Sequence, residues 1–313
     1  MTSTAGQVLT KVPAPAIFSK PEASPLGLLT GADVRKACRN GSHQWSTSGL
    51  AKTYIQANLM ILPSRYASDF RLLCARNPVP CPLAAESATV GKWDEVKSWI
   101  TGLSGKGILS VADIRRDVPK YMVYKDGKVA KSLCDDIVEE WTEDHVAFLI
   151  GCSYSFESAL TAAGLPPRHA IMNTMTTMYR TKVPLCPAGV FTGGTYVVSM
   201  RPYKQKDIET VRSITRAFSV THGEPIAWGW DAVKKLGIKD IDVPEWGGAP
   251  LGLDGGRFGA LDGDEDNIPV FWGCGVTPQE AVMRAGLEGT IMAHAPGHML
   301  VLDCHDWDIM AKA

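Results

Sequence analysis

Residues 146–159 read Val-Ala-Phe-Leu-Ile-Gly-Cys-Ser-Tyr-Ser-Phe-Glu-Ser-Ala, an apolar run that stops at a glycine and gives way to a polar segment. The run 146–150 is typical of a buried strand. After it, Ser155 is the predicted N-cap of a helix that has Glu157 in its first turn and ends at Gly164. A strand that passes directly into a helix turns free backbone N–H groups toward one point, which favours an anion or a developing oxyanion there.

A second stretch repeats this pattern. Residues 270–281 read Val-Phe-Trp-Gly-Cys-Gly-Val-Thr-Pro-Gln-Glu-Ala. Here Thr277 is the predicted N-cap, Pro278 takes the first helical position and Glu280 completes a capping box.

The two stretches align without a gap. Residues 151–165 match residues 273–287, and an Asp-Val-Pro turn precedes each cysteine at almost the same distance. Chance similarity between two amphipathic units is the alternative. We favour an internal duplication of about residues 113–180 and 238–303, because a repeat fixes the architecture of a chain. The identical pairs are Gly151/Gly273, Cys152/Cys274, Ala159/Ala281, Ala163/Ala285, Gly164/Gly286 and Leu165/Leu287.

The composition excludes several classes of protein. The 313 residues can form one large domain or two ordinary ones, and 45% hydrophobic content is ample for a core. The net charge is −1, and the lysines and arginines are scattered along the sequence. The sequence therefore shows no basic cluster that would bind nucleic acid or an anionic membrane surface. No run of about 18 apolar residues is present, so we expect no membrane span. A small molecule is the partner that remains.

The cysteines and the N-terminus indicate where the protein works. Eight cysteines without CxxC pairs argue against a zinc ribbon, a redox dithiol or a secreted disulfide scaffold, and favour a reducing, cytoplasmic setting. Residues 1–29 are rich in proline and form a predicted flexible tail without a signal-peptide pattern. The absence of arginine there disfavours a mitochondrial presequence without excluding one.

Strands that alternate with helices, with at least one hairpin, predict an α/β fold of the mixed α+β type. We expect internally duplicated strand-turn-helix units on mixed sheets, in one compact unit of two subdomains over residues 30–313. Further predicted helices are one opened by Thr30 and Asp33, a run near 50–54, one capped by Ser64, a surface helix at 93–103 and one at 206–218. Further predicted strands are 56–63, a hairpin of 121–124 and 128–130, 190–191, 196–200 and a last strand after His298.

Cys152 and Cys274 become partners if the two halves pack about a pseudo-twofold axis. Each would then lie at a helix N-terminus, where the thiolate form is favoured. Two thiols that face each other across a cleft can move a proton at the α-carbon of an amino acid. The alternative is that both are small buried hydrophobic side chains, as free cysteines usually are.

Acid–base groups accompany the cysteines. Glu157 can act as a general acid or base, whereas Gln279 at the matching position can only orient or bind; the helix dipole alone also explains a first-turn glutamate. His294 and His298 bracket a Pro-Gly turn, so both can face one pocket as proton donors, acceptors or oxyanion stabilisers. A hydrogen-bonded structural role is the alternative for each. With few other histidines nearby, we expect no metal site.

Polar side chains at strand and helix ends complete the predicted site. An arginine in such a position can bind a carboxylate through two parallel hydrogen bonds, and we expect one of Arg115, Arg180 and Arg201 to bind substrate. Gln56 and Asn58 share one face of a strand, with solvent exposure as the alternative. The full predicted substrate-binding set is Gln56, Asn58, Arg115, Ser153, Ser155, Arg180, Arg201, Thr277 and Gln279.

Eight motifs occur in a fixed order between residues 56 and 298. They are Gln56-Ala57-Asn58, Asn77-Pro78 with Cys81-Pro82, 115–121, 148–157, Met178-Tyr179-Arg180-Thr181, Ser199-Met200-Arg201-Pro202, 271–279 and His294-Ala295-Pro296-Gly297-His298. Together, and over most of the chain from about Thr30, they resemble the hydro-lyases of the YcsI type, a family that includes the D-glutamate cyclase domain. The resemblance is specific for the family and much less so for the substrate.

The resemblance implies a lyase that needs no cofactor and eliminates water from a small amino or hydroxy acid. Conversion of D-glutamate to 5-oxo-D-proline is the activity known in the family. GxGxxG, P-loop, GxSxG and HExxH motifs do not occur. In such a reaction the helix starts after Cys152 and Cys274 would hold the tetrahedral oxyanion. Glu157 or a histidine would move the proton, and an arginine would anchor the α-carboxylate.

One segment departs from the family pattern. The family usually reads His-Gly-Ala-Pro-Val-His-Ile-Gly where residues 222–229 read His-Gly-Glu-Pro-Ile-Ala-Trp-Gly, so Ala227 replaces a histidine and Trp228 follows. If that histidine contacts substrate, this protein acts on a bulkier or different acid. A two-thiol racemase or isomerase and a non-catalytic small-acid-binding protein remain open as alternatives. Besides the small acid, we expect a homodimer partner, no nucleic acid and no membrane.

Overall fold

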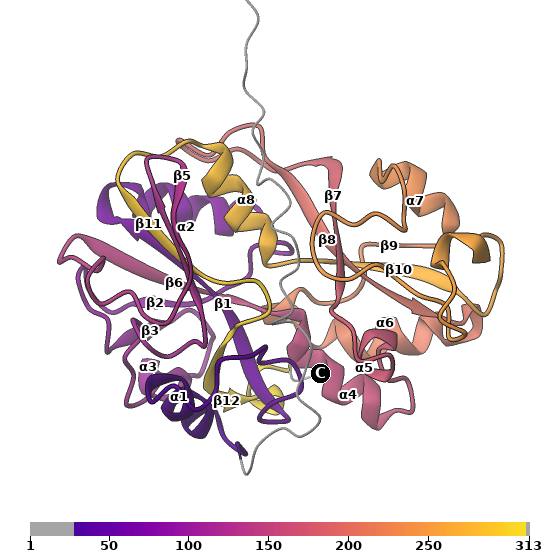
Figure 1. Ribbon diagram of the computed structural model, residues 1–313, viewed down its shortest axis with the longest axis horizontal. Helices are drawn as coiled ribbons and strands as arrows, with labels where there is room; N and C mark the ends of the chain where they lie inside the picture. Colours follow the sequence, from indigo (N-terminus) through magenta and orange to yellow (C-terminus); the bar gives the residue numbers. More distant parts are fainter. Residues whose placement is uncertain (1–27, 311–313) are drawn as a thin grey trace, which may run out of the picture.

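Two antiparallel β-sheets lie side by side in the computed structural model, which describes residues 28–310 (Figure 1). Sheet A, the larger, has the strand order β3-β2-β6-β1-β11-β4-β5, with β12 also pairing β1. Sheet B has the order β7-β8-β10-β9. The α+β class and the compact unit are confirmed. The strand pairs within residues 28–310 are antiparallel, so the sheets are not mixed as expected.

The elements of the described chain follow each other with short connections. The strands of sheet A are β1 (Tyr54–Pro63), β2 (Leu83–Ser87), β3 (Val96–Ser98), β4 (Tyr121–Lys125), β5 (Lys128–Cys134), β6 (His145–Gly151), β11 (Thr290–His294) and β12 (Leu300–His305). Those of sheet B are β7 (Thr177–Pro184), β8 (Thr195–Tyr203), β9 (Ala227–Trp228) and β10 (Ile268–Gly273). The helices are α1 (Gly31–Arg39), α2 (Ala67–Arg76), α3 (Gly105–Ile108), α4 (Glu157–Ala162), α5 (Arg168–Ile171), α6 (Ile208–Arg216), α7 (Trp230–Leu236), α8 (Val276–Arg284) and α9 (Asp306–Ile309). The 3₁₀ turns are η2 (Ser64–Tyr66), η3 (Ser153–Phe156), η4 (Gln205–Asp207), η5 (Ser219–Thr221) and η6 (Phe258–Leu261).

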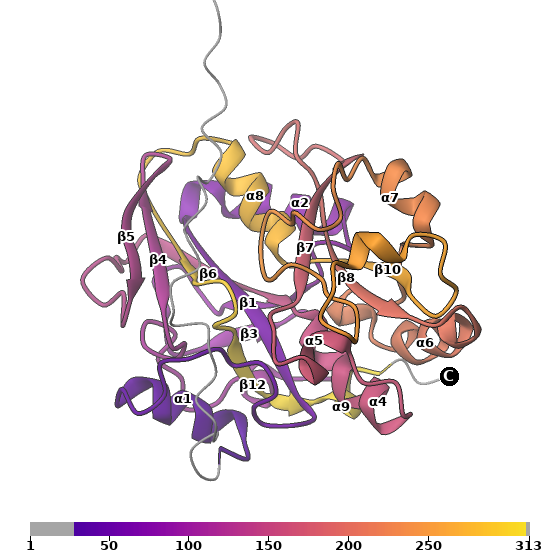
Figure 2. The same ribbon diagram turned by 45° about the vertical axis from the view of Figure 1, so that its right-hand side comes forward.

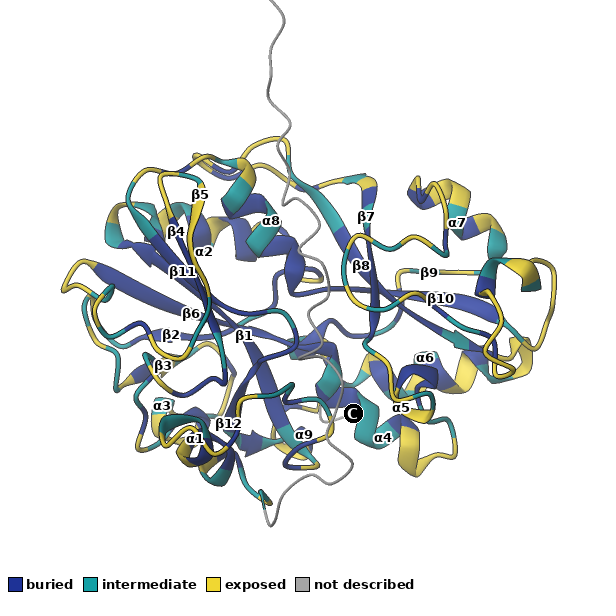
Figure 3. Ribbon diagram, viewed as in Figure 1, coloured by how far each residue is buried: buried dark blue, intermediate teal, exposed yellow. Residues whose placement is uncertain are grey.

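β1 is the central strand of sheet A. Nearly all of its residues are buried, whereas the edge strand β5 is largely exposed (Figure 3). One edge of β1 pairs with β6, and the other edge pairs with β12 and then with β11. Because Ala57 lies opposite Gly151, β1 brings Gln56 and Asn58 to the point where β6 ends.

Alternate residues of sheet A enter two different cores, because successive side chains of a strand point to opposite faces. On one face Met60 packs with Phe70 of α2 and Val282 of α8. On the other face Leu59 belongs to a cluster that also contains Trp272 of sheet B. The second core therefore joins the two sheets, and removal of its apolar surface from water is the main force that holds them together.

The two strand-turn-helix stretches cross between the sheets. β6 belongs to sheet A, but η3 and α4 after it pack beside sheet B, where the ring centroids of Phe156 and Trp272 are 5.5 Å apart. β10 belongs to sheet B, but α8 after it places Ala281 and Val282 in the α2 core of sheet A. Figures 1 and 2 both show α8 at the junction of the sheets. The duplication stays a prediction, but this exchange of helices brings both helix starts to one junction.

Several predicted elements are confirmed by the structure. The Thr30 side chain accepts a hydrogen bond from the Asp33 N–H, and the capping box opens α1 as expected. β1, α2, α6, β8 and the β4–β5 hairpin occupy the segments where strands and helices were predicted. Each of these segments shows a clear periodicity of apolar residues or residues typical of a helix or strand end. Both features can be recognised from the local sequence alone.

Three predicted elements are wrong. The segment 93–103 forms no long helix; it contains β3, which pairs with β2 at the edge of sheet A. The segment 50–54 is a turn with Ala51 and Thr53 at φ 41 and 72, values that a helix does not allow. Phe191 forms only an isolated bridge with Ala188.

Three further expectations concern the chain as a whole. No helix between residues 28 and 310 has the length and apolar character needed to cross a membrane. All eight cysteines lie in this part of the chain, and all are free thiols. The predicted tail lies outside the described residues except for positions 28 and 29. The cytoplasmic location and the homodimer stay predictions.

Candidate active site

Glycines let the chain close up around the two cysteines. A Cβ atom on Gly151 would overlap the carbonyl oxygen of Val220. A Cβ on Gly273 would lie 3.0 Å from the carbonyl oxygen of Val79. Another segment of backbone passes directly against the residue before each cysteine. Glycine is therefore required there, because a larger side chain would collide with that backbone.

Cys152 and Cys274 each have a backbone N–H beside the thiol, and the Cys274 thiol also donates to the Met178 sulfur at 3.5 Å. The thiol of Cys152 accepts a hydrogen bond from the Tyr154 N–H, and the thiol of Cys274 accepts one from the Val276 N–H. Burial raises the pKa of Cys152 to about 12, and the charges of Cys274 and Glu157 raise it as well; burial raises the pKa of Cys274 to about 11. Both are therefore neutral thiols at pH 7. The expectation that the helix starts favour thiolates is wrong, because desolvation outweighs the helix dipole.

Arg201 is the centre of the polar network beside the cysteines. It is fully buried on β8, and its Nε donates to Oε1 of Glu157 at 2.9 Å. The two terminal nitrogens donate to the hydroxyls of Ser199 and Ser153, each at 3.0 Å. Since its donors are largely committed to protein groups, Arg201 positions the α4 start rather than leaving a free guanidinium for a carboxylate.

Glu157 bridges Arg201 and a histidine. Its Oε2 lies 3.3 Å from Nε2 of His169, which is also 3.2 Å from the hydroxyl of Thr176. Burial opposes ionisation of Glu157, but the positive charges of His169 and Arg201 outweigh it and lower the pKa of the carboxyl. Glu157 is therefore ionised and paired, which suits it to hold a proton donor in place. A hollow of about 20 Å³ borders His169 on the side of sheet B.

Asn58 lies between the two helix starts. Its amide donates to the carbonyl oxygens of Ile150 and Gly151, at 3.3 and 3.2 Å. A Cβ atom on Gly275 would overlap the same amide. Asn58 thus contacts the residue before Cys152 and the residue after Cys274, and it is the side chain that joins the two halves of the site.

Gln56 has a structural partner. Its side-chain amide donates to the carbonyl of Thr47 at 3.0 Å, and its oxygen accepts from the Thr47 hydroxyl at 2.9 Å. Both Gln56 and Asn58 are 4% exposed, so the alternative of solvent exposure is wrong.

His294 and Gln279 meet beneath α8. The Leu59 N–H lies 3.1 Å and the Gln279 amide nitrogen 3.0 Å from Nδ1 of His294, and the Leu59 carbonyl oxygen is slightly farther, at 3.2 Å. Two donors on Nδ1 favour the tautomer with the proton on Nε2. Burial lowers the pKa of His294 to about 4, so the ring is neutral at pH 7 and can donate a hydrogen bond from Nε2.

His298 lies on the far side of the Pro-Gly turn. Its Nδ1 is 2.8 Å from the carbonyl oxygen of Pro296, and it is 4% exposed. Burial lowers its pKa, as do the charges of His43 and Lys120. The charge of His298 in turn lowers the pKa of His294, so the two rings lie within electrostatic range of each other.

The N-caps predicted for the two helices of the site are wrong. Ser155 lies inside the turn η3, and its hydroxyl accepts from the Gln56 N–H at 3.2 Å. Thr277 is already helical; its hydroxyl donates to the Val197 carbonyl at 3.1 Å and accepts from the Val197 N–H at 2.9 Å. Each hydroxyl ties its helix start to a strand instead of capping the helix, and Glu280 completes no capping box.

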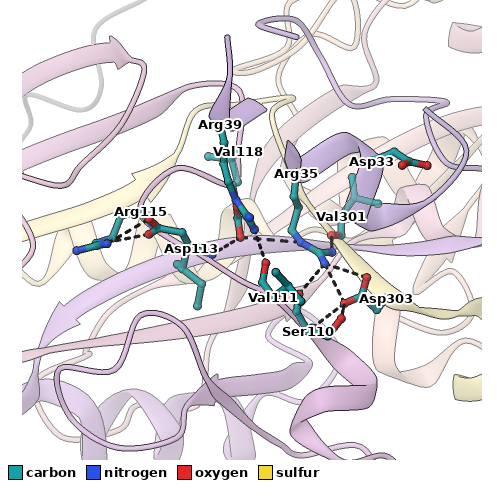
Figure 4. A network of polar contacts seen from close by, with 12 residues as sticks. Asp33, Arg35, Arg39, Ser110, Val111, Asp113, Arg115, Val118, Val301 and Asp303 are labelled. Atoms are coloured by element: carbon teal, nitrogen blue, oxygen red, sulfur yellow. Dashed lines mark hydrogen bonds and ion pairs between the residues drawn. The ribbon is translucent and has the colours of Figure 1, made fainter. Parts of the chain in front are cut away.

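The remaining arginines are paired with protein groups, and Trp246, a partner of Arg180, packs against the cluster of Cys274. Nε of Arg180 donates to Glu280 of α8 at 3.0 Å, and the guanidinium lies over the Trp246 ring. Arg115 pairs with Asp113 and lies over Trp93, close to the network of Figure 4. Within residues 28–310 none of these contacts of Arg115 reaches the cysteines.

Sequence reasoning missed His222. It is 2% exposed, and its Nδ1 lies 2.8 Å from the carbonyl of Val79, the group that also touches Gly273. Its Nε2 is buried without a hydrogen-bond partner in the described chain. Burial and the charge of Arg201 lower its pKa to about 4, against the opposing effect of the Val79 and Gly151 carbonyls.

His222 therefore lies beside both Gly-Cys turns as a neutral imidazole with a free lone pair on Nε2. Its backbone has φ 88, which is strained for a histidine. Such strain persists where the surroundings impose it, often at functional sites. The sequence held two signals: His222 opens the segment 222–229 that resembles the family pattern, and Gly223, which also has positive φ, indicates an unusual turn.

Comparison with known proteins shows the family of this chain. The D-glutamate cyclase family matches residues 146–303, the span from β6 to β12. A "Putative hydro-lyase" of Schizosaccharomyces pombe is 44% identical and covers 90% of this chain and 87% of its own length. A "Putative hydro-lyase" of Natranaerobius thermophilus is 40% identical and covers 88% of this chain and 95% of its own.

Among solved structures, a nitrogen repressor-like protein from Methanococcus jannaschii matches 82% of this chain and 89% of its own, with a TM-score of 0.32 and 8% identity. A similarity that low carries no argument about the fold. The relatives by sequence extend over nearly the whole described chain, and the family match spans both Gly-Cys turns. The chain therefore belongs to the D-glutamate cyclase family and is a lyase, as its motifs imply.

Proposed function

We propose that this protein is a cofactor-independent hydro-lyase that removes water from a small amino or hydroxy carboxylic acid, with D-glutamate to 5-oxo-D-proline as the first reaction to test. The family supports this proposal by its description, and the site supports it by its chemistry. The observation that carries it is the meeting of two Gly-Cys helix starts at Asn58, beside two neutral histidines.

The reaction needs a neutral amine and a way for hydroxide to leave. The amine nitrogen attacks the side-chain carboxyl carbon, so a C–N bond forms, a C–O bond breaks and one water leaves. Nε2 of His222 is the acceptor for the amine proton. The Nε2–H of His294 donates to the developing oxyanion, where one such donor is worth roughly 10²–10³ in rate.

The cysteines act as acids in this proposal. A thiol whose pKa lies near 11 or 12 is a poor nucleophile, because the thiolate is the reactive form. A neutral S–H can donate a proton to the leaving oxygen and recover it from the amine through His222. A thioester intermediate is not needed.

A racemase or isomerase is the second candidate. The matched hydrogen bonds of the Cys152 and Cys274 thiols favour it, since proton transfer at an α-carbon uses one thiol on each face. It would require one thiolate in the resting site, which the raised pKa of both thiols opposes. Solvent deuterium at the α-carbon without loss of water would identify this activity.

The test is mass spectrometry of D- and L-glutamate and of small hydroxy acids after incubation with the protein. We expect a loss of 18 daltons from one of them. The variants Cys152→Ala and Cys274→Ala should each lower the turnover strongly, whereas Cys186→Ala, at an exposed thiol, should not. Full turnover in both site variants would exclude this site, and no loss of water from any acid would exclude the reaction.

A further inference from the structure

A second hollow lies beside α1, away from Cys152 and Cys274. It has a volume of about 270 Å³ and is formed by α1, the segment after it, the turn before β4 and the segment after β5. This volume is close to the lower end of the ~300–1,000 Å³ range of small-molecule pockets. Its polar lining comes from Cys38, Arg39, Gln44, Arg116, Asp135 and Asp136.

Arg39, which lines the hollow, belongs to an ion-pair network inside the protein. The Arg39 side chain donates to Asp117, which is fully buried and also accepts from the Asp113 N–H at 2.8 Å. Arg35 lies behind it and pairs with Asp303 at 2.9 Å (Figure 4). These groups have partners inside the protein, so the network is a rigid base rather than a set of free ligand contacts.

The mouth of the hollow holds one free charge of each sign. The Arg116 guanidinium has no partner in the described chain. Asp136 accepts only the Val138 N–H, at 3.1 Å on Oδ1, and forms no ion pair with any described residue. Asp135 is different, because Lys120 already pairs with it. An unpaired cation and an unpaired anion on one small hollow match a ligand that carries both charges.

We propose that this hollow binds a zwitterionic α-amino acid, with its carboxylate on Arg116 and its ammonium on Asp136. The site is separate from the cysteine cluster, since none of its lining residues comes from β6, β10 or the helices that follow them. Because both charged partners stand at an exposed mouth, water and salt screen them and binding is weak.

The test uses ligands that cannot form a lactam. Norvaline has both charges, pentanoate has only the carboxylate and butylamine only the ammonium, and isothermal titration at pH 7 and low salt compares them. We expect saturable binding of norvaline, at least about fivefold tighter than that of pentanoate or butylamine. Absence of saturable norvaline binding, or equal binding of all three, would overturn the proposal.

Variants locate the binding. Arg116→Gln and Asp136→Asn should each weaken norvaline binding at least about fivefold; the asparagine keeps the oxygen that accepts the Val138 N–H, so the turn is preserved. Arg76→Gln and Asp262→Asn change exposed charges outside the hollow and serve as matched controls. Cys152→Ala should retain norvaline binding while it lowers turnover. If Cys152→Ala abolishes norvaline binding and Arg116→Gln does not, the ligand binds at the cysteines and the proposed hollow site is wrong.

Discussion

At the scale of single residues, the site is a set of buried polar groups, and these groups differ in how many of their donors and acceptors have hydrogen-bond partners. The polar atoms of Arg201 and Glu157 are paired with each other and with nearby hydroxyls and His169. His222 has a free nitrogen and a strained backbone. A buried nitrogen without a partner costs stability, so its retention points to a role in binding or chemistry.

Replacement of His222 by asparagine tests that role. Asparagine tolerates the positive φ of this position, so the fold should survive while the imidazole is lost. We expect turnover to fall about 10²-fold, the usual contribution of one acid–base group. Steady-state kinetics with a pH profile is the measurement.

His145→Asn is the control for this variant. His145 is equally buried but lies at the other end of β6, where Nε2 is 3.0 Å from the Thr290 carbonyl. Its replacement should lower the melting temperature and leave the turnover of folded protein unchanged. Turnover of the His222 variant within twofold of the wild type would exclude a chemical role.

At the scale of elements, the Gly-Cys turns depend on close backbone contact. A methyl group on Gly151 would overlap the Val220 carbonyl, so Gly151→Ala must separate the end of β6 from the η5 turn. We expect a loss of more than about 2 kcal/mol in the free energy of unfolding and a loss of turnover, because overpacking of a tight site costs roughly 1–3 kcal/mol or more. Urea denaturation measures the change.

Gly107→Ala in α3 is the matched control. An added Cβ there meets only the Ser104 hydroxyl, at 3.5 Å, and φ is not positive. Alanine at such a helical position should stabilise the protein by up to about 1 kcal/mol. Equal effects of the two substitutions would mean that Gly151 is not under steric constraint.

The elements also show what the sequence can and cannot predict. Strand β6, helix α1 and the β4–β5 hairpin follow from local periodicity and turn chemistry. The caps at Ser155 and Thr277 failed because each hydroxyl binds the backbone of a distant strand. A local pattern contains no information about such long-range partners.

The same reason limits the prediction of the site. Cys152, Cys274, Glu157 and Arg201 lie near one another, while their roles in a site stay predictions. The protonation state of the thiols was not predictable, because it depends on burial that only the packed sheets create. His222 was missed for a similar reason, since its free nitrogen exists only in the tertiary structure.

At the scale of the whole molecule, the buried histidines make stability depend on pH. Burial lowers the pKa of His222 and His294 from 6.5 to about 4, so between these values the unfolded chain binds protons that the native state does not. Stability is therefore complete above pH 6.5 and falls as the pH drops toward 4, by about 1.4 kcal/mol per pH unit for each histidine. Asp117 acts in the opposite direction, because burial raises its pKa from 3.8 to about 6.

Urea unfolding at pH 7, 6 and 5 tests this balance. Burial also lowers the pKa of His43, His145 and His298, so these histidines together outweigh Asp117 and Asp306, whose pKa values are raised. We therefore expect stability to fall as the pH drops from 7 to 5, by at least about 1.4 kcal/mol per pH unit below pH 6. His294→Asn should reduce that slope by up to about 1.4 kcal/mol per pH unit, the contribution of one proton. An unchanged slope in that variant would show that His294 is not held neutral in the native state.

The crossing of α4 and α8 between the sheets has a consequence for how the protein can be divided. The span 146–303 that matches the family includes β6 and α8 but lacks β1 and α2, against which they pack. If that fragment is expressed alone, the apolar faces of β6 and α8 are exposed to water, and we expect the fragment to aggregate. The complementary segment 28–145, supplied in the same cell, would restore those faces, so the two pieces should assemble only as a pair.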